Sequence, residues 1–281
     1  MKWRGREQSG NVEDRRGMGK GLLAGGGIIG IIVALITVFV SKDPSALVQL
    51  AQEQAAPPMN TEQKAAQEDQ AEFTAVVLKD TEDVWDKLFP EYFRRTYTHP
   101  KLVLFSGSVQ SACGGASSAT GPFYCPADSK VYIDLTFFDD LKSRFKAPGD
   151  FACAYVIAHE IGHHVQNLLG TSGKVAGMRG RVSESEYNRM SVKLELQADF
   201  YAGVWAHHAQ EMKSIIENGD IEEALNAANA IGDDRLQKEA QGYTVPDAFT
   251  HGTSEQRMRW FRKGYETGDV RQGDTFAARD L

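Results

Sequence analysis

The amino-acid sequence predicts an α+β protein, mostly helical with a small sheet, in which one transmembrane helix precedes a folded domain. Three observations predict it: an uncharged apolar run near the start, two short strand-like segments, and several long segments of helical periodicity. The length of 281 residues, with 42% hydrophobic and 25% charged residues, is typical of a globular protein with one sizeable domain. A net charge of −7 disfavours nucleic acid as a partner.

The predicted transmembrane helix covers residues 22–40, LLAGGGIIGIIVALITVFV, which contain no charged side chain. As a helix, this run spans roughly 28 Å, close to the ~30 Å hydrocarbon core of a bilayer. The basic residues that precede it are Lys2, Arg4, Arg6, Arg15, Arg16 and Lys20, whereas only Lys42 follows closely. The positive-inside rule therefore predicts a cytoplasmic N-terminus over residues 1–21 and an external domain. A cleaved signal peptide is the alternative, although its apolar run is usually about 7–15 residues.

Residues 41–72 are rich in Ala, Gln and Glu and lack apolar periodicity, so we expect a flexible linker there. The folded domain is expected over 73–281. Its first helix is predicted by apolar residues at helical spacing from Phe73 to Leu88, and Pro90 ends it.

Within this domain, two segments have the composition of strands, 102–105 and 130–135, the second with alternating apolar residues. The further helices are expected over 137–145, 150–170, 185–213, 220–240 and 257–265. Capping-box pairs precede two of them: Ser183 with Glu186, and Thr253 with Gln256. Residues 171–182 are expected to form a loop.

The predicted topology indicates the oxidation state of the three cysteines. Cys113 and Cys125 bracket a Gly/Ser-rich loop on the expected external side, where disulfides persist, and they are the disulfide candidate. The alternative is a pair of reduced thiols, because three cysteines leave one unpaired. We expect Cys153, on an apolar helix face, to be a small buried hydrophobic residue.

Residues 159–163 read His-Glu-Ile-Gly-His within a predicted helix. His159 and His163, four residues apart, point to one helix face about 6 Å apart, which suits two ligands of a tetrahedral zinc ion. Glu160 is rotated off that axis, so it would serve as a general base beside the metal. The alternative is an ordinary helix with two exposed histidines.

The third ligand has to come from elsewhere in the chain. The metzincin pattern would need Gly at 166 and His at 169, where this chain has Gln166 and Leu169. Glu195 lies on an apolar helix 32 residues after His163, where a carboxylate needs a partner. Asp199, one turn later, could accept an N–H from a ligating histidine. The alternative is a solvated Glu and a capping Asp. Three other histidines are expected at the surface: His164, His207 and His208.

HEIGHH together with ELQAD downstream resembles the glutamate zincins, and in particular the YpfJ-type neutral zinc metallopeptidases of bacteria. The resemblance runs from the opening MKWRGREQSGNVEDRRG through GPFYCP, VYIDL and ELQADFYAG to THGTSEQR. It implies a zincin-like metallopeptidase domain with one Zn²⁺ per chain. It also implies His159, His163 and Glu195 as metal ligands and Glu160 as the catalytic base.

The sequence therefore predicts a zinc-dependent endopeptidase, a hydrolase anchored in the bacterial inner membrane by a single pass, that acts on a peptide or protein substrate. Zinc-bound water, activated by Glu160, would hydrolyse the peptide bond. His251 is the candidate for stabilising the oxyanion, since FTHGTSEQR resembles a histidine-containing segment of related glutamate zincins. The alternative for His251 is a histidine near a helix start.

The segment YCPADSKVYIDL, which ends in the predicted strand 130–135, is the expected sheet edge for an added peptide strand. A sheet edge without a ligand is the alternative. Two other functions use the same residues: a non-catalytic zinc-stabilised scaffold or adaptor of the cell envelope, and a metal amidase acting on cell-wall material. A structural zinc needs no base and usually has four protein ligands, so Glu160 and a three-residue ligand set favour the enzyme.

Overall fold

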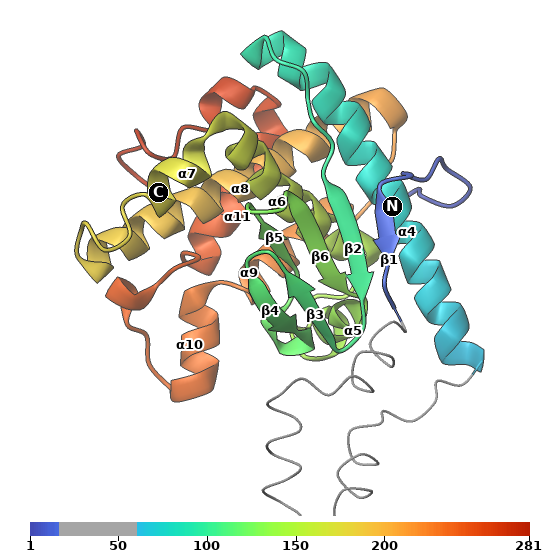
Figure 1. The fold of residues 1–281 in the computed structure, drawn as a ribbon, viewed down its shortest axis with the longest axis horizontal. Helices are drawn as coiled ribbons and strands as arrows, with labels where there is room; N and C mark the ends of the chain where they lie inside the picture. Colours follow the sequence, from blue (N-terminus) through green and yellow to red (C-terminus); the bar gives the residue numbers. More distant parts are fainter. Residues whose placement is uncertain (17–60) are drawn as a thin grey trace, which may run out of the picture.

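A four-stranded mixed sheet in the order β1-β2-β6-β5 lies at the centre of the fold (Figure 1). The computed structural model describes residues 1–16 and 61–281. β1 (Val12–Asp14), β2 (Lys101–Phe105) and β6 (Lys130–Asp134) are parallel, and β5 (Phe123–Cys125) is antiparallel to β6. A separate hairpin joins β3 (Ser108–Ser111) and β4 (Gly114–Ser117).

Helices surround this sheet and make up most of the described chain (Figure 1). They are α4 (Thr61–Leu88), α5 (Thr136–Ser143), α6 (Asp150–Leu169), α7 (Thr171–Ala176), α8 (Glu184–Lys213), α9 (Asp220–Ala230), α10 (Asp233–Gln241) and α11 (Ser254–Thr267). A π-helical turn over Phe89–Phe93 ends α4, with Pro90 in its first turn. The expected α+β fold, mostly helical with a small sheet, is therefore confirmed.

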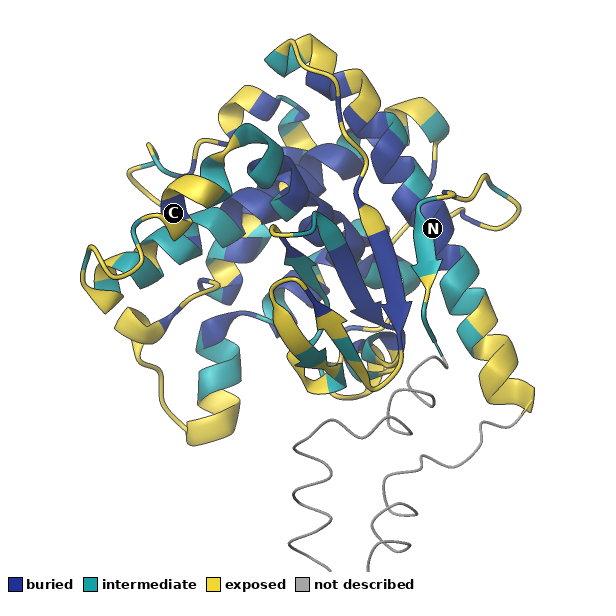
Figure 2. Cartoon of the chain, in the orientation of Figure 1, coloured by how far each residue is buried: buried dark blue, intermediate teal, exposed yellow. Residues whose placement is uncertain are grey.

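Both faces of the sheet are buried (Figure 2). One face packs its apolar side chains, among them Leu102 and Ile133, into the main core with α4, α6, α8 and α11. The other face forms a smaller cluster of Val103, Phe105, Cys125 and Tyr132. Strand 130–135 was expected to bury one face, but Tyr132 on the other face is 1% exposed. Neighbours on this face account for the burial: Phe123 of β5 stacks on Tyr132 with ring centroids 4.8 Å apart, and Val109 of the hairpin packs on the same cluster.

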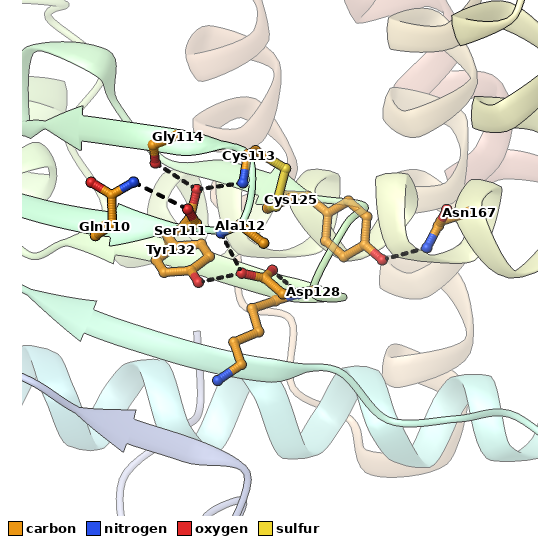
Figure 3. Close-up of a disulfide and its surroundings, with 11 residues drawn as sticks. Gln110, Ser111, Ala112, Cys113, Gly114, Cys125, Asp128, Tyr132 and Asn167 are labelled. Atoms are coloured by element: carbon orange, nitrogen blue, oxygen red, sulfur yellow. Dashed lines mark hydrogen bonds between the residues drawn. A yellow bond between two sulfur atoms is a disulfide. The ribbon is translucent and has the colours of Figure 1, made fainter.

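A disulfide ties the hairpin to the sheet edge (Figure 3). It joins Cys113, in the turn between β3 and β4, to Cys125 on β5. The nearby Asp128 carboxylate accepts hydrogen bonds from the Ala112 N–H at 3.0 Å and the Tyr132 hydroxyl at 2.7 Å. Cys153 is partly buried on α6, and burial raises the pKa of its thiol. The loop and edge strand β5 are therefore held together by covalent and polar contacts.

The first sixteen residues belong to the same folded unit as the rest. β1 pairs in parallel with β2, and the α-ammonium of Met1 lies 2.6 Å from the Asp150 carboxylate on α6. Trp3 is 7% exposed and packs edge-to-face on Phe73 of α4, with ring centroids 5.4 Å apart. The basic N-terminal peptide therefore completes the fold instead of forming a separate segment.

This packing corrects the predicted topology. No helix within residues 1–16 and 61–281 is long and apolar enough to cross a membrane, and the predicted span over 22–40 lies outside the described residues. A single crossing between β1 and α4 would place the hydrogen-bonded strands β1 and β2 on opposite sides of a bilayer. The prediction of a single-pass inner-membrane protein with a cytoplasmic N-terminus is therefore wrong.

Three predicted boundaries also differ from the structure. α4 begins at Thr61, so the last part of the expected linker over 41–72 is helical. The first turns of α4 expose polar residues. Arg4 holds this part of the helix by a hydrogen bond to Asp69 at 2.5 Å. The expected loop over 171–182 begins with the short helix α7. The expected helix over 220–240 breaks into α9 and α10, because the Asp233 carboxylate accepts main-chain N–H groups of residues 250–252.

Replacing Trp3 by alanine tests the packing of the N-terminal peptide. Loss of a buried indole should lower the free energy of unfolding of the full-length chain by about 3 kcal/mol. Tyr243→Ala is the matched control, because this aromatic residue is 62% exposed and its loss should cost less than about 0.5 kcal/mol. Equal stability of the two variants in chemical denaturation would show that Trp3 is not packed in the fold.

Candidate metal centre

Close contact between α6 and α8 brings the predicted ligands together. A Cβ atom at Gly162 would lie 2.9 Å from the Ala198 carbonyl oxygen and 3.0 Å from its Cα. Only glycine allows the two helices to approach this closely, because a side chain at 162 would push the α8 backbone away. The approach places Glu195 of α8 opposite His159 and His163 of α6.

The three side chains have the geometry of a metal site. The Glu195 carboxylate oxygens lie 3.2 Å from His159 Nε2 and 3.4 Å from His163 Nε2, and all three ligand atoms are within 4.8 Å of one another. Tetrahedral zinc bonds of ~2.0–2.1 Å would space neighbouring ligand atoms by about 3.4 Å. The residues therefore fit a zinc ion with three protein ligands and one open position.

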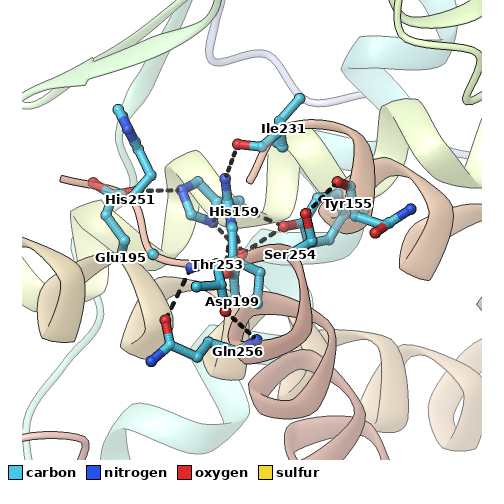
Figure 4. A network of polar contacts seen from close by, with 12 residues as sticks. Tyr155, His159, Glu195, Asp199, Ile231, His251, Thr253, Ser254 and Gln256 are labelled. Carbon is cyan, nitrogen blue, oxygen red and sulfur yellow. Dashed lines mark hydrogen bonds and ion pairs between the residues drawn. The ribbon is translucent and has the colours of Figure 1, made fainter. Parts of the chain in front are cut away.

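A buried network orients His159 (Figure 4). Its Nδ1 donates to Asp199 Oδ1 at 2.8 Å, which leaves Nε2 for the metal. The same carboxylate accepts from the Tyr155 hydroxyl at 2.5 Å and from Arg257 Nε and Nη2 at 2.9 and 3.0 Å. Burial by itself would raise the pKa of Asp199, but the charges of Arg257 and His159 hold it at about 2. Asp199 is thus a fixed anion behind the ligand.

His163 is oriented by a neutral partner. Its Nδ1 donates to Gln166 Oε1 at 2.9 Å, while the Gln166 amide donates to the Leu194 carbonyl at 2.6 Å on α8. Burial would raise the pKa of Glu195, yet the two histidines keep it well below its usual range. The cluster therefore presents two Nε2 atoms and one carboxylate anion toward a common point, where a cation is favoured.

Sequence reasoning assigned no role to Tyr155 or Arg257, and it used Gln166 only to exclude the metzincin pattern. A signal for Arg257 was present in α11. This arginine shares a helix face with Trp260, Phe261 and Gly264, all buried, at positions i, i+3, i+4 and i+7. Arginine in a core position needs a buried carboxylate, and Asp199 supplies it.

Glu160 and His251 border the same cavity, which has a volume of about 840 Å³. Glu160 is 8% exposed, and among the described residues no donor pairs with its carboxylate. His251 Nδ1 lies 3.2 Å from Asp233 Oδ1, and this hydrogen bond raises the pKa of His251. The structure thus brings both candidate catalytic residues to one space next to His159, His163 and Glu195.

The three histidines expected at the surface are placed differently. His164 is 1% exposed, and its Nε2 donates to the Thr98 carbonyl at 2.6 Å. Burial lowers the pKa of His164 to about 4. His208 is 9% exposed and His207 is partly buried. The surface placement of His164 and His208 is therefore wrong, because both rings bond main-chain carbonyls of packed segments.

The strand at the cavity is not the one expected. β6, which covers most of 130–135, pairs with β2 on one side and with β5 on the other, so both of its edges are occupied. β5 is the end strand of the described sheet, and Phe123 and Tyr124 line the cavity. The end strand is therefore β5, whose Tyr124 and Cys125 belong to the expected segment YCPADSKVYIDL, whereas both edges of the expected strand 130–135 are paired.

Two histidines and a glutamate gather around one point, beside an unpaired glutamate and a cavity, in an arrangement that could hold a metal ion. The family model described as "Putative neutral zinc metallopeptidase" matches residues 1–276. The Escherichia coli (strain K12) "Uncharacterized protein YpfJ" is 48% identical over 98% of this chain and 99% of its own length. The Mycobacterium tuberculosis (strain H37Rv) "Uncharacterized protein Rv2575" is 46% identical over 70% of this chain and 68% of its own length.

No solved structure is significantly similar to this chain. The chain belongs to the neutral zinc metallopeptidase family, and the resemblance inferred from its motifs is confirmed. Membership supports a zinc-dependent hydrolase of peptides, without specifying the substrate or the roles of single residues.

His163→Ala tests the ligand assignment. The variant should hold one zinc ion per chain fewer than the wild type, because a ligand of a three-residue site is lost. Metal analysis after dialysis against dilute zinc measures this, with His99→Ala, a histidine outside the cluster, as the control. Unchanged zinc content in His163→Ala would mean that the metal binds elsewhere.

Asp199→Asn tests the partner behind His159. The substitution keeps the side-chain shape but removes the anion that fixes the His159 ring, so zinc affinity should fall by roughly 10–100-fold. Competition with a chelator measures the affinity, and Asp247→Asn, at an exposed aspartate, should leave it unchanged. Equal affinity in the Asp199 and Asp247 variants would contradict the orienting role.

Proposed function

We propose that this protein is a zinc-dependent endopeptidase in which Glu160 is the general base. The observation that carries the proposal is the position of Glu160, on the cavity wall one residue from the ligand His159, with a carboxylate that no described donor occupies. A site that only stabilised the fold would not need such a group. The family's description supports the same class of reaction.

His159, His163 and Glu195 would hold the zinc ion, which when bound supplies a Lewis acid and lowers the pKa of water. The Glu160 carboxylate would accept a proton from the attacking water molecule. It would then pass this proton to the nitrogen of the departing amine as the peptide bond breaks. Water is thus divided between the new carboxyl group and the new amine.

His251 would stabilise the negative charge that develops on the carbonyl oxygen when water attacks the carbonyl carbon. Its Nδ1 bonds Asp233, so Nε2 is the ring nitrogen left to donate into the cavity. The raised pKa of His251, caused first by the Asp233 hydrogen bond, favours the doubly protonated ring that can donate from both nitrogens. Asp233 would therefore act as a positioning residue for His251.

The substrate would add to the sheet as an extended strand beside β5. The edge of β5 borders the cavity that contains Glu160, and main-chain hydrogen bonds to such an edge recognise a peptide without demanding a particular side chain. Apolar side chains line the adjoining wall, among them Phe123, Phe137, Val156 and Leu194. They favour a substrate with apolar residues next to the cleaved bond.

The decisive experiment compares Glu160→Gln with wild type in the full-length chain. Glutamine keeps the size of the side chain but accepts no proton, so cleavage of a peptide library should slow by roughly 10²–10⁴-fold. Zinc content and melting temperature should not change, since Glu160 is not a ligand. Glu255→Gln, an exposed glutamate at the start of α11, is the control and should keep full activity.

Denatured envelope proteins and cell-wall fragments should be offered as parallel substrates. Cleavage of cell-wall fragments alone would favour the amidase. A wild-type protein that binds zinc but cleaves none of these substrates, or a Glu160→Gln variant as active as wild type, would favour the scaffold.

A further inference from the structure

A second group of metal-ligating side chains lies near the C-terminal end of α8, more than two turns beyond Asp199. It consists of His207, His208 and Glu211, whose ligand atoms lie within 4.8 Å of one another. The Glu211 oxygens are 3.5 Å from His207 Nε2 and 3.2 Å from His208 Nδ1. This residue set, and these distances, match those of the first centre, where the corresponding separations are 3.2 and 3.4 Å.

Main-chain carbonyls of the α11 C-terminus fix both imidazole rings. His207 Nδ1 donates to the Tyr265 carbonyl at 2.7 Å, and His208 Nε2 donates to the Gly268 carbonyl at 2.9 Å. In neutral rings, the two other nitrogens are then lone-pair acceptors. Both face the Glu211 carboxylate, which also only accepts. Facing acceptors repel one another unless a cation lies between them.

The second nitrogen of His208 has no hydrogen-bond partner. His208 is nine-tenths buried, and its Nδ1 is inaccessible and makes no hydrogen bond within the described chain. A buried, unpaired polar atom is costly, so this nitrogen needs either a proton that pairs it with Glu211, 3.2 Å away, or a cation.

The His207 ring is held just as firmly. Gly268 has a left-handed backbone (φ 59°), and a Cβ atom there would lie 2.3 Å from His207 Cδ2 and 2.6 Å from its Nε2. Glycine at the end of α11 therefore leaves the space that the ring occupies. Both nitrogens are thus positioned before any ligand binds.

We propose that His207, His208 and Glu211 form a second binding site for a first-row divalent cation such as Zn²⁺. Two imidazole nitrogens and one carboxylate are donors that suit zinc or cobalt, and water would complete the coordination. Glu211 is 57% exposed, so the site opens to solvent. All three ligands belong to α8, and the contacts to α11 are the hydrogen bonds that orient the two rings.

The test counts zinc in four full-length proteins under saturating zinc. The wild type should hold two ions per chain, Glu211→Ala one, His163→Ala one, and the double variant none. Glu184→Ala is the matched control, because Glu184 is an exposed glutamate in the first turn of the same helix, and it should hold two. Because Glu211 lies at the surface, its removal should leave the fold intact, as circular dichroism would verify.

Affinity and coordination provide a second readout. In the His163→Ala background, cobalt should produce a visible absorption band of a low-symmetry site, and adding Glu211→Ala should weaken binding at least about tenfold. Zinc should raise the melting temperature of His163→Ala but not of the double variant. Two outcomes would overturn the proposal: a single ion in the wild type, or equal zinc content with and without Glu211. Either would mean that protons alone bridge the two histidines and Glu211.

The inference does not depend on the proposed peptidase activity. A wild-type protein that holds two ions but cleaves no substrate would sustain this site and remove only the proposed function. A wild-type protein that cleaves peptides but holds a single ion would do the reverse.

Discussion

The buried Asp199 carboxylate is the interaction on which the rest of the structure depends. It is fully enclosed, yet it binds Tyr155 and His159 of α6 and Arg257 of α11, so it joins three helices at one point. A buried carboxylate without such partners would cost several kcal/mol, and removing Arg257 would leave that charge uncompensated. The same contacts therefore pack α6, α8 and α11 together and orient the His159 ring. The metal site is a property of the core, not of a surface loop.

The two histidine–glutamate groups, one between α6 and α8 and the other on α8 alone, illustrate two ways to orient an imidazole. At the first centre, the N–H groups opposite the ligand atoms donate to side chains, Asp199 and Gln166. At the second group, they donate to main-chain carbonyls at the end of α11. An anionic partner increases the electron density on the ring, whereas a carbonyl only fixes its direction. This difference favours tighter metal binding at the first centre and weaker metal binding at the proposed second site.

The N-terminal peptide is part of the folded unit that the family model matches. β1 covers one edge of β2, which would otherwise expose unpaired main-chain groups. Trp3 and Arg6 bind α4, through Phe73 and through the Asp80 carboxylate at 2.5 Å. The family match over 1–276 therefore follows a structural unit whose first strand is at its N-terminus. Four of the basic residues that suggested a membrane boundary pair with carboxylates within the fold: Arg4, Arg6, Arg15 and Arg16.

The α+β class and the long helices could be predicted from the sequence, and so could the candidate roles of His159, Glu160, His163 and Glu195, because helical spacing and residue type are local properties. The sequence also predicted the cap of α11, where Thr253 and Gln256 form a complete capping box. Tertiary contacts were needed to show that Arg257 pairs with Asp199, that β5 is the end strand of the described sheet, and that residues 1–16 join this sheet. Those contacts connect segments tens to hundreds of residues apart. Their energies depend on which groups share a desolvated space, and no local periodicity encodes that.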